Sequence, residues 1–250
     1  MTYNLAVSPD FKPDLLSGWF IFNTWLQHQL DTGIHFEIHQ GFDEQLEAID
    51  ADKVDIIYAN PYDISRLVRD KGFIPVAKPH AKPDEAIVVT AAEGGINVIP
   101  DLDVSATIAK THARDVDSIG MILLEPADIT PQSAQTLECD TYICVAKALI
   151  NGKADVGFML TEAFNELSPL VAKQLKPLVS SQIQLIHHAI LLGPQLAEHH
   201  DALAAFLTDM HNTEKGKKIL DDLGISHWEP MDKEEAEFMI DLMDTLAPKE

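Results

Sequence analysis

Hydrophobic and polar positions in the first third of the chain alternate between two periods. Four short apolar runs have the pattern of strands, at residues 3–7, 35–39, 54–59 and 73–77. Three segments have helical spacing, at residues 13–30, 43–49 and 62–69. Because helices separate the strands, this part of the chain predicts parallel βαβ units and a sheet covered by helices.

The same alternation restarts near residue 86. Strands are expected at residues 86–90, 104–109, 154–159, 175–179 and 183–192. Helices are expected at 118–124 and 140–150, and after Pro194 the chain is expected to be purely helical, at 197–211, 214–223 and 233–246. The sequence shows no internal repeat and no flexible linker, so it predicts an α/β protein with two closely connected units.

The charge of the chain narrows the range of partners. With 18 Lys and Arg against 40 Asp and Glu, the formal net charge is −22, and 46% of the residues are hydrophobic. Nucleic acids and anionic membrane surfaces require clustered cations, which this sequence lacks. We therefore expect a globular protein with an ordinary core that binds neither nucleic acid nor an anionic membrane surface.

Compartment and redox state follow from the N-terminus and the cysteines. The first residues enter a strand-like run at once, and no apolar stretch is long enough to span a membrane. The expected location is therefore the periplasm if a leader has been removed, and otherwise the cytoplasm. Cys139 and Cys144 lie in an expected helix on different faces, so we expect two packing thiols and no disulfide.

The ends of the predicted strands are the expected place for a ligand. Open α/β sheets bind ligands beyond the carboxyl ends of their strands, and a cleft between two lobes is a preferred site. The relevant loops follow Val7, Tyr58, Ala109 and Met159.

Three segments resemble one family of proteins. Residues 54–62 followed by 72–79 (VDIIYANPY and GFIPVAKP) are similar to the family's run "VDI-x-Y-x-x-P-Y … G-(aromatic)-x-P-(V/L)-A". Residues 148–157 (ALINGKADVG) and 214–220 (EKGKKIL) resemble its helix-to-strand turn and its C-terminal helix. The family is that of PhnD-like substrate-binding proteins of phosphonate, phosphite and phosphate ABC importers.

The resemblance implies a type II periplasmic-binding-protein fold with two lobes that close on a small ligand. By this analogy, lobe one is residues 1–87 plus 187–250, and lobe two is residues 88–186. The implied function is that of a solute-binding protein for a small oxyanion, such as phosphonate or phosphate, that serves an ABC permease. The implied protein is not an enzyme and uses no cofactor.

The family grips its anion with hydroxyls and backbone N–H groups at a helix N-terminus in lobe two, where the helix dipole favours negative charge. The matching residues here are Ser118, Ile119 and Gly120. This chain has one hydroxyl where the family has two or three, and Asp117 precedes it. Asp117 is either the N-cap of the helix or a cleft-facing carboxylate that repels a doubly charged phosphonate.

Further ligand contacts are expected at the other strand and helix ends. In lobe one they are Asp10, Phe11, Tyr58, Asn60 and Tyr62, and in lobe two they are Thr111, His112, Tyr142, Thr161 and Glu162. For Tyr58 and Tyr62 the alternative is an aromatic residue packed under a helix, and for Asp10 and Phe11 it is an ordinary turn.

Two other functions remain open. A cytoplasmic sensor of the same fold would need no leader, and an enzyme on this fold would have to use His112, Asp117, Cys139 or Glu162. Eleven histidines are present, but no H-x-x-x-H or C-x-x-C motif occurs, so the sequence predicts no metal site.

Overall fold

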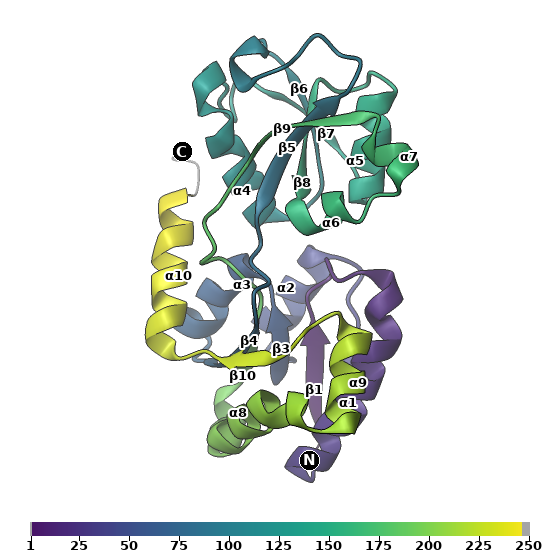
Figure 1. Ribbon diagram of the computed structural model, residues 1–250. Coiled ribbons are helices and arrows are strands. Elements are labelled where there is room, and N and C mark those ends of the chain that lie inside the picture. The colour runs from purple at the N-terminus through teal and green to yellow at the C-terminus, as the bar shows by residue number, and fades with distance from the viewer. Residues whose placement is uncertain (1, 247–250) are drawn as a thin grey trace. The chain divides into compact units, whose positions relative to one another are not determined.

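The computed structural model describes residues 2–246, which form two compact units (Figure 1). Unit 1 comprises residues 2–82 and 187–242, and unit 2 comprises residues 83–186 with 243–246. The chain thus leaves unit 1 after residue 82 and returns to it at residue 187. The boundary expected from the sequence, after residue 87, falls inside the strand β5 (Ala86–Ala91) of unit 2.

Unit 1 contains a six-stranded mixed sheet with the strand order β11-β4-β10-β3-β1-β2. Its strands are β1 (Thr2–Val7), β2 (Gly33–Glu37), β3 (Ile56–Ala59), β4 (Ile74–Pro79), β10 (Ala189–Leu192) and β11 (Trp228–Pro230). β1 pairs in parallel with β2 and β3. β10 runs antiparallel between β3 and β4, and β11 is antiparallel to β4.

Helices cover both faces of this sheet (Figure 1). They are η1 (Pro13–Leu15), α1 (Leu16–Leu30), α2 (Phe42–Asp50), α3 (Pro61–Ser65), the π-helix η2 (Arg66–Asp70), η5 (Pro194–His199), α8 (His200–Asp209), η6 (Met210–Asn212), α9 (Glu214–Leu223) and α10 (Lys233–Leu246). Alternate strand residues enter two separate cores. Leu5 and Ile56 pack against α1, α8 and α9, whereas Ala6 and Ile57 pack against α2, α3 and α10.

Unit 2 contains a five-stranded sheet with the order β7-β6-β8-β5-β9. Besides β5, its strands are β6 (Thr107–Lys110), β7 (Gln135–Glu138), β8 (Val156–Leu160) and β9 (Leu175–Ser180). Its helices are η3 (Ile99–Asp101), α4 (Arg114–Leu123), η4 (Glu125–Ala127), α5 (Tyr142–Ile150), α6 (Thr161–Asn165) and α7 (Pro169–Ala172).

Among the described strands, five strands of unit 1 and the five strands of unit 2 share one topology, and β11 has no counterpart. β6 pairs in parallel with β7 and β8, as β1 does with β2 and β3. β5 runs antiparallel between β8 and β9, as β10 does between β3 and β4. In both sheets the antiparallel strand is the one by which the chain enters the unit from the other. Loops at equivalent strand ends can therefore be compared directly.

Several elements differ from the sequence-based prediction. The short strands β7 and β11 were not expected, so the chain is not purely helical after Pro194. The strand expected at 183–192 is confined to β10. Cys139 lies before α5, outside the helix in which we expected both cysteines, and both thiols are free.

The start of α4 is the difference that matters most for the site. The apolar pattern predicted a helix from Ser118, but the helix begins at Arg114, with Ala113 as its N-cap. The prediction failed because the first turn is polar and Ala113 carries no capping side chain. Asp117 is therefore not an N-cap: its backbone N–H already donates to the carbonyl of Ala113 at 3.0 Å.

Gly120 has a packing role inside α4. A Cβ at this position would lie 2.6 Å from the ring of Phe158 in β8, closer than atoms can approach. Phe158 is only 1% exposed and cannot move aside. Glycine thus allows α4 to pack tightly against the central sheet of unit 2.

We expect Gly120→Ala to lower the free energy of unfolding by about 1–3 kcal/mol, because the added methyl overpacks the contact with Phe158. The matched control is Gly95→Ala, at an exposed glycine whose added Cβ would meet no atom within 4 Å. Urea unfolding monitored by circular dichroism measures both. An equal loss of stability in the two variants would contradict the packing role.

Candidate functional site

The carboxyl ends of β1 and β3 meet the start of β10 at one edge of the sheet of unit 1. Val7 pairs with Tyr58 in the parallel register of β1 and β3. Ala189 lies opposite Ala59 in the antiparallel register of β10 and β3. His188, which precedes β10, is therefore placed beside the loops that follow β1 and β3.

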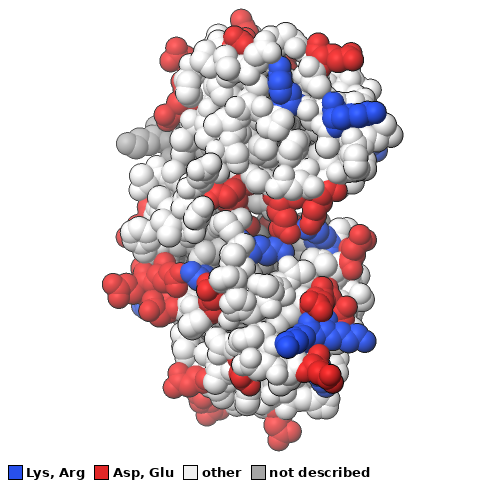
Figure 2. Space-filling model, viewed as in Figure 1, with Lys and Arg blue, Asp and Glu red and all other residues white. Residues whose placement is uncertain are grey.

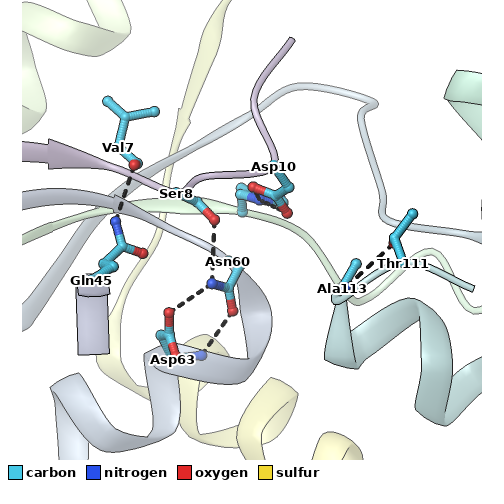
Figure 3. A network of polar contacts seen from close by, with 9 residues as sticks. Val7, Ser8, Asp10, Gln45, Asn60, Asp63, Thr111 and Ala113 are labelled. Atoms are coloured by element: carbon cyan, nitrogen blue, oxygen red, sulfur yellow. Dashed lines mark hydrogen bonds and ion pairs between the residues drawn. The ribbon is translucent and has the colours of Figure 1, made fainter. Parts of the chain in front are cut away.

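A hydrogen-bonded network fixes the two loops to each other (Figure 3). The backbone N–H of Ser8 donates to the carbonyl of Tyr58 at 2.8 Å. The side-chain amide of Asn60 donates to Ser8 Oγ at 3.2 Å and to Asp63 at 2.7 Å, and its oxygen accepts from the N–H of Asp63 at 2.9 Å. Because its side-chain oxygen accepts this N–H, Asn60 is the N-cap of α3. Asn60 is 2% exposed, so these hydrogen bonds are shielded from water and hold the turn in place.

Asp10 and His188 form an ion pair beside this network. Nε2 of His188 lies 3.1 Å and 3.2 Å from the two carboxylate oxygens of Asp10, and the two side chains are 12% and 18% exposed. Burial raises the pKa of Asp10, but the charge of His188 and the hydrogen bonds from His188 and Ser8 outweigh it and hold the pKa below its ordinary value. The carboxylate is therefore ionised and directed at the imidazole.

Tyr58 forms an aromatic wall behind this pair. Its ring stacks on the imidazole of His188, with centroids 5.1 Å apart, and lies 4.9 Å from the ring of Trp19. Tyr58 is 8% exposed and Trp19 only 2%, so Trp19 belongs to the core. Of the other residues expected here, Phe11 packs partly buried against the same core, and Tyr62 is exposed.

In unit 2, the equivalent position after β6 carries Thr111 and His112. Thr111 Oγ1 accepts from the backbone N–H of Ala113 at 3.4 Å, directly before the first turn of α4 (Figure 3). His112 is exposed, and its Nδ1 lies 3.7 Å from the carboxylate of Glu138. Thr111 therefore stands at the positive end of the helix dipole.

The three residues expected to form the anion loop lie elsewhere in α4. Ser118, Ile119 and Gly120 are in the second turn, where their backbone N–H groups belong to the helix. Ile119 is buried, and Gly120 contacts Phe158. The N-terminus of the helix is at residues 113–116, four to five residues earlier than predicted.

Asp117 has a partner in the same unit. Its carboxylate lies 2.8 Å from Nζ of Lys110, and the same ammonium lies 3.6 Å from Glu138. The charge of Asp117 is thus offset by Lys110, a partner that the sequence did not predict.

The other residues expected in unit 2 are at helix starts. Tyr142 opens α5, which Thr141 caps by accepting from the N–H of Cys144 at 3.3 Å. Thr161 and Glu162 open α6, and the hydroxyl of Thr161 lies 3.1 Å from that of Ser180. Their part in ligand binding stays a prediction.

Three residues at these strand ends were missed. Ser8 and His188 lie in the network of unit 1, and Glu85 precedes β5 as His188 precedes β10. Glu85 is 9% exposed and accepts hydrogen bonds from the hydroxyl of Ser181 and the backbone of Gln184. His188 was missed because the sequence predicted it inside a strand at 183–192, whereas it lies just before β10. Ser8 lies in the turn expected after the first strand, so the sequence could have indicated it.

Cys139 does not have the environment of a reactive thiol. Burial is the main cause that raises its pKa above the ordinary value, and Cys144, Asp140 and Glu138 add to it. Because the thiolate is the nucleophile, a raised pKa disfavours this residue as a catalytic group.

The charged surface offers little bulk attraction for an anion. Acidic side chains are spread over the face of the molecule drawn in Figure 2, where basic side chains are fewer. Several of the cations are paired with carboxylates, including Arg69 with Glu237 and Lys71 with Asp52. Any affinity for an anion must therefore come from local dipoles and hydrogen-bond donors.

Two α/β units of the same topology, with polar side chains at their strand ends, define a two-lobed solute-binding protein of the type II periplasmic-binding-protein fold. Residues 5–236 match the family model described as "ABC transporter, phosphonate, periplasmic substrate-binding protein". The chain belongs to this family, which is a family of binding proteins and not of enzymes. The family resemblance and the fold class predicted from the sequence are confirmed.

Solved structures show the same fold at low identity. PhnD1 from Prochlorococcus marinus, in complex with methylphosphonate, has a TM-score of 0.82 at 12% identity, covering 98% of this chain and 98% of that one. A binding protein of a phosphonate ABC transporter from Pseudomonas aeruginosa has 0.76 at 19%, covering 97% and 87%. The aliphatic sulphonate binding protein SsuA from Escherichia coli has 0.64 at 14%, covering 99% and 89%.

Two further comparisons complete the description. No curated protein sequence matches the chain. Among residues 2–246, no helix combines the length and the apolar content needed to cross a membrane.

We expect Asp10→Asn to lower the free energy of unfolding by about 1–3 kcal/mol at pH 7, because it removes the charged partner of His188. The native pKa of Asp10 is lowered, so its stabilising contribution is present above the ordinary value of 3.8 and is lost as the pH falls below it. The difference between wild type and variant should therefore shrink below pH 3.8. Chemical unfolding between pH 7 and pH 3 measures it.

Asp14→Asn is the control, because Asp14 is an exposed carboxylate of η1 in the same unit. Its effect should stay within about 0.5 kcal/mol. The ion pair would lose its assigned role if both variants behaved alike, or if the difference for Asp10→Asn did not decrease as the pH falls below 3.8.

Proposed function

We propose that this protein binds a small organic oxyanion of the phosphonate or sulfonate class in the periplasm and delivers it to the permease of an ABC importer. The observation that carries the proposal is the position of Thr111 and the first turn of α4 at the carboxyl end of β6. An anion there meets a hydroxyl donor and the positive end of a helix dipole. The methylphosphonate and sulphonate proteins of the same fold support this ligand class, since both ligands carry a tetrahedral oxyanion.

The pairing of carboxylates at the strand ends of each unit supports an anionic ligand. Asp117 is neutralised by Lys110 at 2.8 Å, so it no longer argues against a charged phosphonate. Asp10 is likewise paired with His188, whose imidazole can donate to an anion when it is protonated. In a site with little water, such local groups outweigh a distant surface charge.

The ligand contacts of unit 1 are proposed on the same basis. Tyr58 and His188 present a stacked aromatic pair at the strand ends, which suits the organic substituent of such a ligand. Ser8 and Asn60 hold the loops that carry this pair, so their role is to position it. Thr161 and Tyr142 remain proposed contacts of unit 2.

The experiment is a thermal-shift screen of the full chain with methylphosphonate, ethanesulfonate, phosphate and sulfate. A ligand at 100 times its Kd stabilises the folded state by about 2.7 kcal/mol. For a chain of this size, that corresponds to a rise in Tm of about 5–10 °C. We expect such a rise with methylphosphonate or ethanesulfonate.

Thr111→Val tests the site, because valine keeps the shape of threonine and removes the hydroxyl. The ligand-induced rise in Tm should fall in this variant and persist in Thr136→Val, the same change at an exposed position in β7. If none of the four anions raised the Tm, the oxyanion proposal would be wrong. An undiminished rise in Thr111→Val would instead place the ligand elsewhere.

A further inference from the structure

Two histidines lie at the outer side of the sheet of unit 1: His80 directly follows β4, and His227 directly precedes β11. In the antiparallel register, Trp228 is opposite Pro79 and Glu229 is opposite Lys78. The backbone N–H of His80 donates to the carbonyl of His227 at 2.9 Å, which extends the pairing by one residue. Because strand residues two apart share a face, His227 and Glu229 lie on one face, with His80 across from them.

The side chains of these three residues converge. One ligand atom from each of His80, His227 and Glu229 lies within 4.8 Å of the other two. Nδ1 of His80 is 2.8 Å from the carboxylate of Glu229, and the rings of His80 and His227 stack at 4.1 Å. A tetrahedral zinc ion needs donor atoms about 3.3 Å apart, so the side chains would rotate to bring these atoms closer together when an ion binds.

We propose that His80, His227 and Glu229 form a binding site for a divalent transition-metal ion of the zinc type. Two imidazole nitrogens and one carboxylate oxygen are a ligand set that zinc accepts, with water in the fourth position. The group is the one such cluster of three found among residues 2–246. The site lies at the same end of the sheet as Asp10 and His188, since β4 is parallel to β3, but on the outermost strand pair, β4 and β11.

Exposure and charge favour the entry of a cation. The side chains of His80 and Glu229 are 44% and 39% exposed, so an ion reaches them from solvent. Lys78, the cation opposite Glu229, is paired with Glu235, which offsets its repulsion of a metal.

Two neighbours orient the ring of His227. Its Nδ1 lies 3.3 Å from the hydroxyl of Ser226, so Nε2 is the nitrogen left to bind a metal. The ring of His211, from η6, lies 5.3 Å from that of His227. Nδ1 of His211 is buried without a hydrogen-bond partner among the described residues. An imidazole with unused hydrogen-bonding capacity thus stands directly behind the proposed ligands.

A metal here would have a structural effect. β11 contains three residues and pairs only with β4 among the described strands. An ion bound by His80, His227 and Glu229 would add a link between the end of β4 and the edge strand β11. Because the ion binds the folded chain, it should raise the Tm as its free concentration exceeds Kd.

The test is isothermal titration calorimetry of the full chain, first stripped with a chelator, with Zn²⁺ at pH 7.5. We expect one equivalent to bind and the Tm to rise with it. His80→Ala, His227→Ala and Glu229→Gln should each weaken binding by about tenfold or more, which is typical of disturbing a metal site. His35→Ala, at an exposed histidine of β2, is the control and should bind like wild type.

Cobalt supplies a second measurement, which reports the ligands and geometry of the bound ion. Co²⁺ bound by these ligands in tetrahedral geometry should give strong visible absorption, and Glu229→Gln, which keeps the volume of the side chain, should alter it. The proposal would be overturned if wild type bound no Zn²⁺ saturably. It would also fall if the variants at positions 80, 227 and 229, shown folded by circular dichroism, bound Zn²⁺ as wild type does.

Discussion

The position of β10 is the constraint on which unit 1 depends. This strand returns from unit 2 and pairs with β3 on one side and β4 on the other, so it joins the two halves of the sheet. Its antiparallel direction also brings His188 to the edge where β1 and β3 end. β5 has the same place in unit 2, with Glu85 before it. The strands that connect the units therefore also set the positions of charged side chains.

The sequence predicted those parts of the fold that bury apolar side chains. Strands such as β3 and β8 are almost wholly buried, and their apolar runs were visible without a structure. β7 was missed because its four residues are mostly exposed and show no apolar alternation. The start of α4 was misplaced for a related reason, since apolar periodicity begins only after its polar first turn.

The chemistry of the site was less accessible to the sequence because it depends on register between distant strands. Tyr58, near the end of β3, and Asp10, after β1, were expected at the site from the sequence, whereas their contact with His188 requires the pairing of β10 with β3. His80 and His227 are likewise joined by the pairing of β4 with β11. Local motifs such as H-x-x-x-H describe helices, and they could not reveal ligands supplied by two paired strands.

The interrupted course of the chain through unit 1 has a consequence for its synthesis. Residues 2–82 are synthesised before residues 187–242, so β3 and β4 lack the strand that lies between them until β10 has been made. At ordinary rates of translation this delay is roughly 5–20 s. Unit 2 is continuous over residues 83–186 and can fold during that interval. The edges of β3 and β4 that later pair with β10 are therefore unpaired in the nascent chain. Unpaired strand edges promote aggregation, so binding by a chaperone would protect the chain until β10 is inserted.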